Sequence, residues 1–385
     1  MFRTLFVDVA LGLAGLAACG GQPQVIDPAP RGTTPVRLIV TPADVALFPA
    51  DTQRFRAHGV TATGDSVGAT ASFAATGGTV TADGLFQAGP LPGDYQIVAT
   101  AVGGAASGIA RVAVQPNGRP LANECAAPQP EWIWCDDFDQ DRLAKYFEFD
   151  QAQGAFVRMD GVGNDGSAGM RGRFAAGQVS AGSLHLAFGK TPQPYFRPVD
   201  AGTASYREIY WRVFIKNAPT WTGGGGFKLT RATSFSSSTT WAQAMIAHLW
   251  SGSSAPRHNH LVIDPASGTN PAGTVVTTKY NDFDNLRWLG SVQGKTPVFA
   301  SPNIGKWHCV EAHVRLNDAN RSNGVFQVWI DGQPDAGRSD LNWVGGYSSY
   351  GINAIFLENY WNTGAPVAQE RYFDNFVVST KPIGC

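Results

Sequence analysis

The sequence predicts an all-β protein made of two β-sandwiches, a small one followed by a larger, antiparallel one. Short segments of alternating polar and apolar residues recur along the chain between clusters that contain glycine or proline, which is typical of strands and turns. Long helical periodicity is scarce. Only 139–147 and 240–250 are candidate helices, and the second is ambiguous by pattern. The second part of the chain, with about 260 residues, is long enough for one large core.

The first 19 residues are predicted to be a targeting segment. Arg3 precedes a mostly apolar run that is interrupted by Asp8 and is too short to span a bilayer. The run ends in Leu16-Ala17-Ala18-Cys19, which resembles the lipobox where bacterial lipoproteins are cleaved and lipidated on the cysteine. We therefore expect an exported protein that is attached to a membrane through Cys19, with an ordinary secretory signal as the alternative. Gly20 favours the outer membrane of a Gram-negative cell, on its periplasmic or cell-surface side.

A tether and a small domain follow. Residues 20–35 are rich in proline and glycine, which indicates a tether. The spacing of short alternating segments from 36 to 116 indicates a small β-sandwich. Its candidate strands are 36–42, 53–60, 71–78, 93–102 and 109–116. The segment 76–100 resembles bacterial Ig-like domains, which implies a spacer, with adhesion as the alternative. Residues 117–123 are predicted to be a linker.

The second body, 124–385, is predicted to be a larger antiparallel sandwich or jelly roll. Its candidate strands are 207–216, 258–264, 306–317, 324–333, 352–361 and 371–380. The segment 307–317 alternates for a full strand length, so it has two different faces. One face is mostly apolar, and the other carries Trp307, Cys309, Glu311, His313 and Arg315. Because burying such polar groups is costly, we expect this row to line a groove or a solvated surface.

Cysteine usage agrees with export. Apart from Cys19 the chain contains four cysteines, and an even set in an exported protein suggests two disulfides with three possible pairings. We expect Cys125–Cys135, which closes a short local loop, and Cys309–Cys385, which fastens the last residue to a strand. A free, buried Cys309 is the alternative.

Several motifs of the second body together resemble the jelly-roll polysaccharide lyases, notably the alginate and glucuronan lyases with a concanavalin-like fold. In chain order they are 226–229, 241–250, 307–311, 315–317, 323–325, 328–332 and 373–380. The resemblance implies β-elimination on 4-linked uronic acids. This reaction needs a group that neutralises the carboxylate, a base that removes the neighbouring proton, and an acid that protonates the departing glycosidic oxygen.

The family's catalytic pattern is matched only in part. Lys228 follows a glycine-rich turn, as the family's lysine does, although a solvated lysine is the alternative. Relatives carry a serine and an arginine on the strand that corresponds to 241–250. This chain has no arginine there, and His248 and Gln243 are the polar groups that can contribute.

A histidine pair stands where relatives carry a Tyr-x-Tyr pair on the following strand. His258 and His260 are two residues apart, so on a strand they share one face. We expect them to transfer protons or contact substrate. A metal site and ordinary surface histidines are the alternatives.

Further substrate contacts are predicted from Glu311, His313 and Arg315. Glu311 and Arg315 form a structural ion pair in the alternative interpretation. Tyr360 and Trp361 can stack on sugar rings, and core packing explains them equally well.

The charge balance and the acidic residues limit the partners. With 29 basic and 30 acidic residues, the chain lacks the basic footprint of a nucleic-acid-binding protein. No cofactor or metal is expected. Calcium is a weaker alternative at the acidic run, which lacks the glycine and terminal glutamate of an EF-hand loop. That run comprises Asp136, Asp137, Asp139 and Asp141. We expect a monomer that binds an acidic polysaccharide.

Three functions follow from these observations. We favour a polysaccharide lyase, and a non-catalytic glycan-binding or adhesive lipoprotein is the alternative. A two-carboxylate glycosidase using Glu311 and Glu358 is weaker, because no strand carries closely spaced acids of that type.

Overall fold

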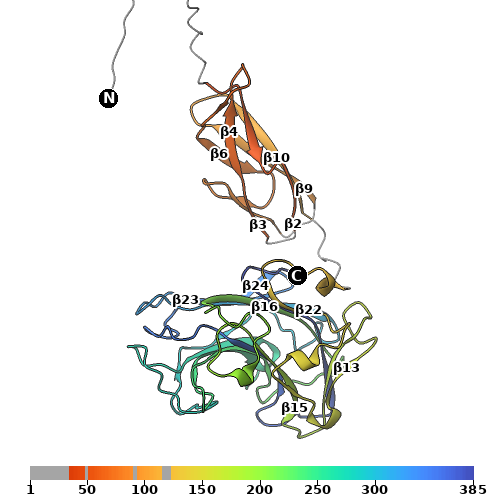
Figure 1. Ribbon diagram of the computed structural model, residues 1–385. Coiled ribbons are helices and arrows are strands. Elements are labelled where there is room, and N and C mark those ends of the chain that lie inside the picture. Colours follow the sequence, from red (N-terminus) through yellow and green to blue (C-terminus); the bar gives the residue numbers. More distant parts are fainter. Residues whose placement is uncertain (1–33, 48–50, 90–92, 115–122) are drawn as a thin grey trace, which may run out of the picture.

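The computed structural model describes residues 34–47, 51–89, 93–114 and 123–385. The predicted signal at 1–19 with Cys19, nearly all of the tether at 20–35 and most of the linker at 117–123 lie outside these residues. Strands make up almost all of the described regular structure, with short 3-10 turns between them (Figure 1). In the described part of the chain, no helix has the length and apolar character needed to cross a membrane. The predicted all-β fold class is confirmed.

The first body consists of short strands around one apolar core. They are β1 (Arg37–Thr41), β2 (Asp44–Leu47), β3 (Thr52–Arg54), β4 (Arg56–Val60), β5 (Ser66–Val67), β6 (Ala71–Ala75), β7 (Thr79–Val80), β8 (Leu85–Gln87), β9 (Gly93–Ala101) and β10 (Ser107–Val114). Their sheets have the orders β1-β4-β5, β2-β10-β9-β6 and β3-β8-β7. Phe55, Phe86 and Ile97 are fully buried in the core. The candidate strands of this body are confirmed, and its Ig-like character stays a prediction.

The second body contains two eight-stranded sheets. Its strands are β11 (Trp132–Asp136), β12 (Glu148–Asp150), β13 (Phe156–Met159), β14 (Gly169–Phe174), β15 (Ser180–Ala187), β16 (Glu208–Asn217), β17 (Lys228–Phe235), β18 (Gln243–Ser251), β19 (Leu261–Ser267), β20 (Arg287–Trp288), β21 (Val292–Gln293), β22 (Trp307–Arg315), β23 (Gly324–Ile330), β24 (Gln333–Leu341), β25 (Ala354–Tyr360) and β26 (Gln369–Ser379). The 3-10 turns are η1 (Glu124–Ala126), η2 (Leu143–Lys145), η3 (Ala152–Gly154), η4 (Pro194–Phe196) and η5 (Arg257–Asn259).

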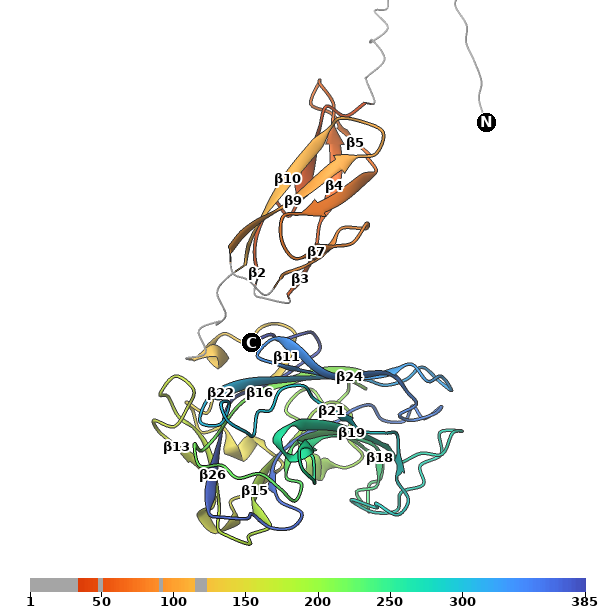
Figure 2. The same cartoon turned by 180° about the vertical axis from the view of Figure 1, so that it is seen from behind.

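In each sheet, some neighbouring strands are consecutive in the chain and others are distant in sequence. The first sheet runs β13-β14-β26-β16-β22-β23-β24, with β11 beside β26. The second sheet runs β12-β15-β25-β17-β18-β19-β20, with β21 beside β19. All pairings within the two sheets are antiparallel. Figures 1 and 2 show this body from opposite sides.

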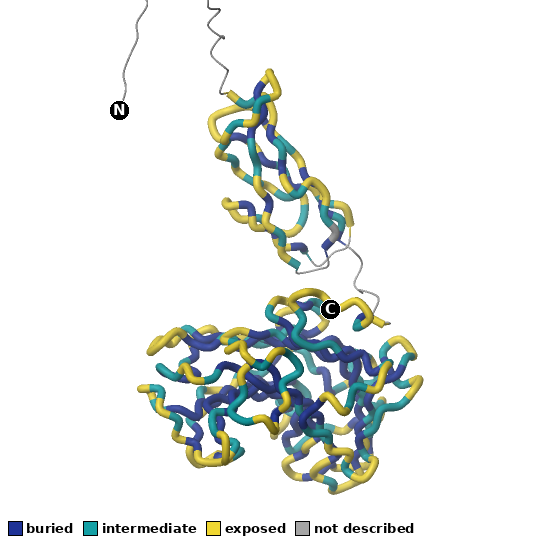
Figure 3. Tube along the Cα trace, in the orientation of Figure 1, coloured by how far each residue is buried: buried dark blue, intermediate teal, exposed yellow. Residues whose placement is uncertain are grey.

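The two sheets pack against each other on one continuous core. Apolar residues at alternate positions of both sheets are buried in it, among them Trp211 of β16 and Leu357 of β25 (Figure 3). A hydrogen bond crosses the core, because Trp211 Nε1 donates to Thr230 Oγ1 of β17 at 3.0 Å. Each sheet therefore has an inner face toward the core and an outer face.

Two sequence-based expectations about local structure are wrong. The candidate helix at 139–147 contains only the 3-10 turn η2, and 240–250 folds mostly as strand β18. β18 lies between β17 and β19, where its alternate side chains reach the core and the outer face, so tertiary packing overrides the ambiguous pattern.

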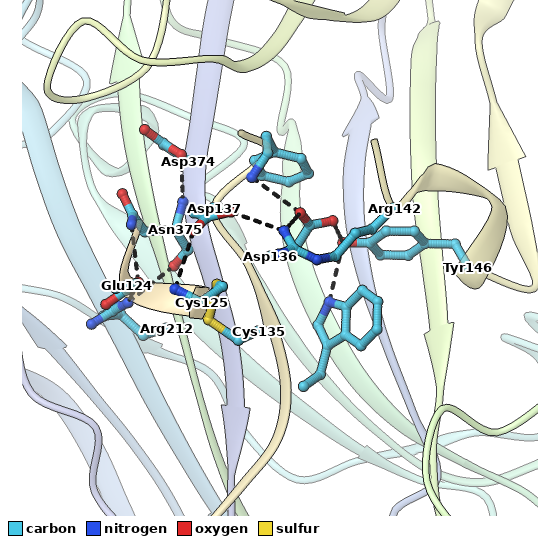
Figure 4. The surroundings of a disulfide bond; sticks show 12 residues. Glu124, Cys125, Cys135, Asp136, Asp137, Arg142, Tyr146, Arg212, Asp374 and Asn375 are labelled. Atoms are coloured by element: carbon cyan, nitrogen blue, oxygen red, sulfur yellow. Dashed lines mark hydrogen bonds and ion pairs between the residues drawn. A yellow bond between two sulfur atoms is a disulfide. The ribbon is translucent and has the colours of Figure 1, made fainter. Parts of the chain in front are cut away.

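Both disulfides are confirmed. The Cα atoms of Cys125 and Cys135 are 5.4 Å apart, and those of Cys309 and Cys385 are 5.8 Å apart. Figure 4 shows Cys125–Cys135 beside the buried Glu124, which forms an ion pair with Arg212. The first disulfide therefore fastens the start of the second body to the outer face of the first sheet.

The acidic run is engaged within the protein. Asp136 accepts hydrogen bonds from the backbone N–H of Phe138 and from Tyr146, and Arg142 pairs with both Asp136 and Asp137 (Figure 4). Among the described residues, no group of three histidine, cysteine or acidic side chains is arranged to hold a metal ion. Nothing in the described structure therefore supports calcium at this run.

Candidate functional site

The candidate site is a hollow of about 430 Å³ on the outer face of the second sheet. Its floor comes from β15, β25, β17 and β18, and the segment after β19 forms one wall. The side chains that carry its chemistry are those of His185, Lys228, Arg231, His248, Trp250, Tyr280, Asn281, Trp288, Glu358 and Tyr360. Of the residues predicted from sequence, this hollow brings together Lys228, His248 and Tyr360.

Lys228 enters the hollow directly after the glycine-rich turn. Gly224, Gly225 and Gly226 have positive φ values of 130°, 70° and 65°, which residues with a side chain rarely adopt. The ammonium of Lys228 lies 4.5 Å from the centroid of the Tyr360 ring. Burial lowers the pKa of Lys228; Glu358 opposes this effect and Arg231 adds to it. The amine is thus closer to its neutral, basic form than an exposed lysine.

Arg231 organises one side of the hollow. Its guanidinium donates to Asn281 Oδ1 at 2.7 Å and to the Tyr280 hydroxyl, and it pairs with Glu358 at 2.9 Å. The arginine and glutamate side chains are only 1% and 7% exposed. Burial raises the pKa of Tyr280 to about 12, so this phenol keeps its proton at neutral pH. The second carboxylate oxygen of Glu358 has no hydrogen-bonding partner among the described residues.

Gln243 acts behind the site and does not line it. It is 1% exposed, donates to Thr233 Oγ1 at 2.9 Å and accepts from the backbone N–H of Asn281 at 3.0 Å. It therefore holds the segment that presents Asn281 and Tyr280 to Arg231. The prediction that Gln243 contacts substrate directly is not supported by this placement.

His248 is a neutral group between aromatic rings. Its ring is stacked with Trp250 and with Trp288, at centroid distances of 5.5 and 5.8 Å. Burial lowers the pKa of His248 well below its usual value, as do the charges of Arg231 and Lys228, against a weaker opposite effect of the Asp264 backbone. The imidazole is therefore uncharged at neutral pH.

An aromatic wall continues outward from His248. The rings of Trp288 and Phe283 are stacked, with their centroids 6.3 Å apart. Trp288 is 42% exposed and Phe283 is 45% exposed. Exposed ring faces of this kind pack against the apolar faces of sugars. The hollow therefore combines charged groups at its floor with rings at its rim.

His185 borders the site on the opposite side. Its ring stacks on that of Phe356, with the two centroids 3.6 Å apart, and its Nδ1 lies 2.8 Å from Glu148 Oε2. Burial would raise the pKa of Glu148, but hydrogen bonds from His185 and Tyr195 outweigh this effect and lower it. Sequence analysis did not select His185 because it lies on a strand with no recognised motif.

Arg371 supports the floor from within the core. It is fully buried on β26 and donates to the backbone carbonyls of Lys228 and Glu358, at 3.0 and 3.1 Å. Burial lowers the pKa of Arg371 to about 9, against an opposing effect of Glu358. It thereby fixes the two strands that carry the charged groups of the site.

The histidine pair does not reach the hollow. His258 belongs to the 3-10 turn η5, and His260 precedes β19. The strand begins only at Leu261, so the expectation that the two rings share a strand face is wrong. On β19 the outer face carries Val262 and Asp264, which pair with Trp250 and His248. The phenols of the site come instead from Tyr280 and Tyr360.

Trp361 is a core residue. It is fully buried among Phe174, Trp221 and Phe227, and its Nε1 donates to the carbonyl of Gly224. The prediction that it stacks on a sugar is wrong, because no face of its ring is exposed.

The polar row of β22 lies on the other sheet, away from the hollow. Glu311 accepts the backbone N–H groups of Ile383 and Gly384, at 2.7 and 3.0 Å, and is 6% exposed. It makes these contacts in place of the suggested ion pair with Arg315. The row was expected to line a groove or a solvated surface. Glu311 is not solvated, because the C-terminal segment covers it, but it does border a small groove.

The other two members of that row are also held within the first sheet. His313 is 6% exposed and bonds to Glu208 and Gln327, at 2.8 and 3.0 Å. Arg315 donates to the carbonyl of Asn323. Glu311 and His313 border a small groove on this outer face, with Trp329. None of the three contributes to the hollow that contains Lys228.

A β-bulge explains why Arg231 was missed. The pairing register of β17 shifts between Lys228 and Thr230, so Lys228 and Arg231 reach the same face although they are three residues apart. Strict alternation would place them on opposite faces. The candidate arginine was also sought on 241–250, whereas the structure supplies it from the neighbouring strand.

Comparisons with known proteins give the following similarities. No family model and no curated protein matches the chain. An alginate lyase from Aplysia kurodai is 12% identical, over 65% of this chain and 99% of that one, with a TM-score of 0.45. A glucuronan lyase from the fungus Trichoderma reesei is 12% identical, over 65% and 96%, with a TM-score of 0.44. An alginate lyase from a Chlorella virus is 11% identical, over 59% and 89%, with a TM-score of 0.41.

Such likeness assigns no activity to this chain, because chemistry depends on the residues of the site. What the hollow offers is an amine with a lowered pKa, a buried guanidinium, two phenols, a neutral imidazole and an aromatic rim. These groups suit the binding of an acidic sugar and the transfer of protons to and from it.

Proposed function

We propose that the second body is a polysaccharide lyase that cleaves a uronic-acid-containing polysaccharide by β-elimination. The observation that carries the proposal is the convergence of Lys228, Arg231, Tyr280 and Tyr360 on one hollow of about 430 Å³. The sequence motifs that resemble alginate and glucuronan lyases support the same chemistry. The aromatic wall supports a sugar polymer as the ligand.

The reaction assigns a role to each group. The base removes the proton on the carbon next to the carboxylate, the electron pair of that C–H bond forms a carbon–carbon double bond, and the bond to the glycosidic oxygen breaks. Lys228 is the base in this proposal, because burial moves its pKa toward the operating range. Tyr280 is the acid that protonates the leaving oxygen, since it retains its proton and its hydroxyl oxygen is held by Arg231.

The carboxylate of the substrate requires a positive or hydrogen-bonding environment. Arg231 supplies positive charge beneath the hollow, although Glu358 pairs with it. The carboxylate of Glu358 lines the hollow and is the acceptor for a sugar hydroxyl in this proposal. The floor thus offers both a cation and an acceptor to a hydroxylated, acidic ring.

Non-catalytic glycan binding is the second candidate function. It is favoured by the pairing of Arg231 with Glu358, which leaves less charge for the substrate carboxylate, and by Val262 and Asp264 on the outer face of β19. The two functions differ in one observable, since only a lyase releases unsaturated uronates.

The decisive experiment follows ultraviolet absorbance of unsaturated uronates while the full chain is incubated with alginate, glucuronan and glycosaminoglycans. We expect product with at least one polymer, and a rate that rises with pH as Lys228 loses its proton. Replacing Lys228→Met should reduce the rate about 100-fold or more, as expected when a general base is lost.

Lys190→Met is the matched control. Its ammonium also lies over an aromatic ring, 5.1 Å from the Tyr350 centroid, but it is exposed and outside the hollow. Its rate should equal that of the wild type. Absence of unsaturated product across the whole panel, with saccharide binding retained, would establish the non-catalytic function instead.

The proposal also includes export and lipid attachment. The lipobox-like segment ending at Cys19 supports it. The two disulfides are of the kind formed in oxidising compartments and agree with it. The protein would then act from the outer membrane, on its periplasmic or cell-surface side.

A further inference from the structure

A row of four side chains crosses the outer face of the first sheet, away from the hollow. Arg171 of β14, Tyr372 of β26, Lys216 of β16 and Trp307 of β22 stand opposite one another on adjacent strands. All four are partly exposed. Cation and ring therefore alternate along one line across the sheet. This row is called the outer row below.

Lys216 lies between two aromatic rings. Its ammonium is 4.8 Å from the Trp307 centroid and 4.9 Å from the Tyr372 centroid. Cation–π contacts of this kind hold an ammonium without neutralising it. Burial lowers the pKa of Lys216, and no charged neighbour contributes to that change. The ammonium is thus fixed in place and keeps its charge available.

Neither cation of the outer row has an acidic partner within the described residues. Among the described residues no ion pair involves Lys216 or Arg171, and both side chains are partly exposed. Glu370 of β26 accepts from the Tyr372 hydroxyl at 2.6 Å and lies 3.9 Å from Arg173. The charge of the outer row therefore remains open to a ligand.

We propose that the outer row is a second binding site, for the carboxylates and ring faces of a polyuronate chain. Charge complementarity selects this occupant, because Lys216 lies between two rings and Arg171 stands beside Tyr372, and neither cation has an ion-pair partner among the described residues. Sugar carboxylates would meet Lys216 and Arg171, and the sugar rings would pack beside Trp307 and Tyr372. The site shares only its ligand class with the proposed function.

The outer row is separate from the hollow. It lies on the outer face of the first sheet, whereas Lys228 lies on the outer face of the second sheet, and the apolar core is between them. A polymer held at the outer row therefore does not occupy the hollow of the same molecule. Its role is to keep the protein on its polymer while the hollow is free.

The test is affinity electrophoresis of the full chain in gels containing alginate or glucuronan. We expect retardation by both polymers, and about tenfold weaker retardation for Lys216→Gln and for Trp307→Ala, with normal near-ultraviolet circular dichroism. Lys190→Gln is the matched control, because it removes a lysine that also lies over a ring. It should migrate as the wild type does.

Two further gels test the chemistry of the ligand. A neutral soluble β-glucan should not retard the protein, because it lacks carboxylates. Poly-glutamate, which has carboxylates but no sugar rings, should retard it less than alginate does. Equal retardation by poly-glutamate would overturn the proposal, since it would reveal general polyanion binding. Unchanged retardation of both variants, or none for the wild type, would overturn it as well.

The retardation test of the outer row does not depend on whether the hollow is catalytic. If the hollow is a lyase site, Lys216→Gln should cleave short oligouronates at the wild-type rate while losing polymer retardation. If no unsaturated product forms but retardation depends on Lys216 and Trp307, the proposed function fails and the outer row stands.

Discussion

At the scale of single residues, the buried pair between Arg231 and Glu358 dominates the site. Removing one partner of such a pair leaves an uncompensated charge in a place that water hardly reaches. Glu358→Gln should therefore lower the free energy of unfolding by about 3 kcal/mol. Urea unfolding followed by tryptophan fluorescence measures this change.

The matched control for that substitution is Asp340→Asn, which breaks the exposed pair with Arg338. Exposed pairs contribute about 0–1 kcal/mol, so the control should change the free energy of unfolding little. Equal losses in the two variants would contradict the argument that burial makes the Glu358 pair costly to break.

The buried carboxyl of Asp374 makes the free energy of unfolding depend on pH. Burial raises its pKa to about 7, above the usual 3.8, although the backbone N–H groups of Asn164 and Asn375 oppose this. The folded state therefore binds the proton more tightly than the unfolded state does. The contribution of this carboxyl to the free energy of unfolding is complete below about pH 4 and falls as pH rises toward about 7.

Asp374→Asn should remove this contribution. The free energy of unfolding of the wild type should fall by up to about 4 kcal/mol more than that of the variant between pH 4 and pH 8. Burial also raises the pKa values of Asp136 and Asp264 to about 6, so these carboxyls too lower the free energy of unfolding as pH rises. They do so in both the wild type and the variant, and the difference between the two proteins therefore reports Asp374 alone. Urea unfolding across this pH range is the measurement, and parallel curves would refute the prediction. Asp160→Asn, at a 90% exposed side chain, is the control.

At the scale of elements, the C-terminal segment is fastened to β22 twice. Cys385 forms a disulfide with Cys309, and Glu311 accepts the N–H groups of Ile383 and Gly384. The disulfide joins residues 76 positions apart. Closing a loop of this length stabilises a fold by about 4 kcal/mol in the chain-entropy model.

The double substitution Cys309→Ala/Cys385→Ala should therefore lower the free energy of unfolding by about 4 kcal/mol. Removing Cys125–Cys135, whose residues are 10 apart, should cost less, because the loop is shorter. Urea unfolding of both variants tests the order. A larger loss for the shorter loop would show that native contacts, and not loop entropy, dominate.

β17 shows how one local irregularity places a functional group. Its bulge brings Lys228 and Arg231 to one face, while Thr230 faces the core and accepts from Trp211. The same strand thus supplies two cations to the hollow and one polar contact to the interior. A regular strand of this sequence would have separated the cations.

At the scale of the whole molecule, the predicted lipid on Cys19 would attach the protein to a membrane. If Cys19 is lipidated, cells fed radiolabelled palmitate should label the processed protein that begins at Cys19, and Cys19→Ala should abolish the label because no acceptor thiol remains at the lipobox. Detergent should be needed to extract the wild type. Label that persists in the variant would contradict the lipoprotein assignment.

Much of the fold could be predicted, but less of the site. The candidate strands follow from alternation and are confirmed except at 258–260, which precede β19. Of the three pairings that the cysteine count allows, the structure confirms the two disulfides that were expected. Lys228, His248 and Tyr360 were selected on motifs and lie at the hollow. Glu358 and Tyr280 were not assigned to it, because Glu358 follows the apolar half of its strand without a recognised motif and Tyr280 lies in an irregular segment.

The wrong assignments have one physical origin. Alternation reports that a strand has two different faces, but it does not say which face meets solvent or what covers it. Glu311 looked solvated until the C-terminal segment was seen to lie over it, and His258 and His260 shared a face only if a strand began before Leu261.

Extended segments and their turns are therefore local properties that the amino-acid order already contains, whereas the four cysteines by themselves left three disulfide pairings open. The grouping of Lys228, Arg231, Tyr280 and Glu358 is different, because it requires β17 to bulge, β25 to pair beside it and a distant loop to close over both. Those events depend on contacts between residues far apart in the chain, where packing, and not local preference, sets the lowest free energy.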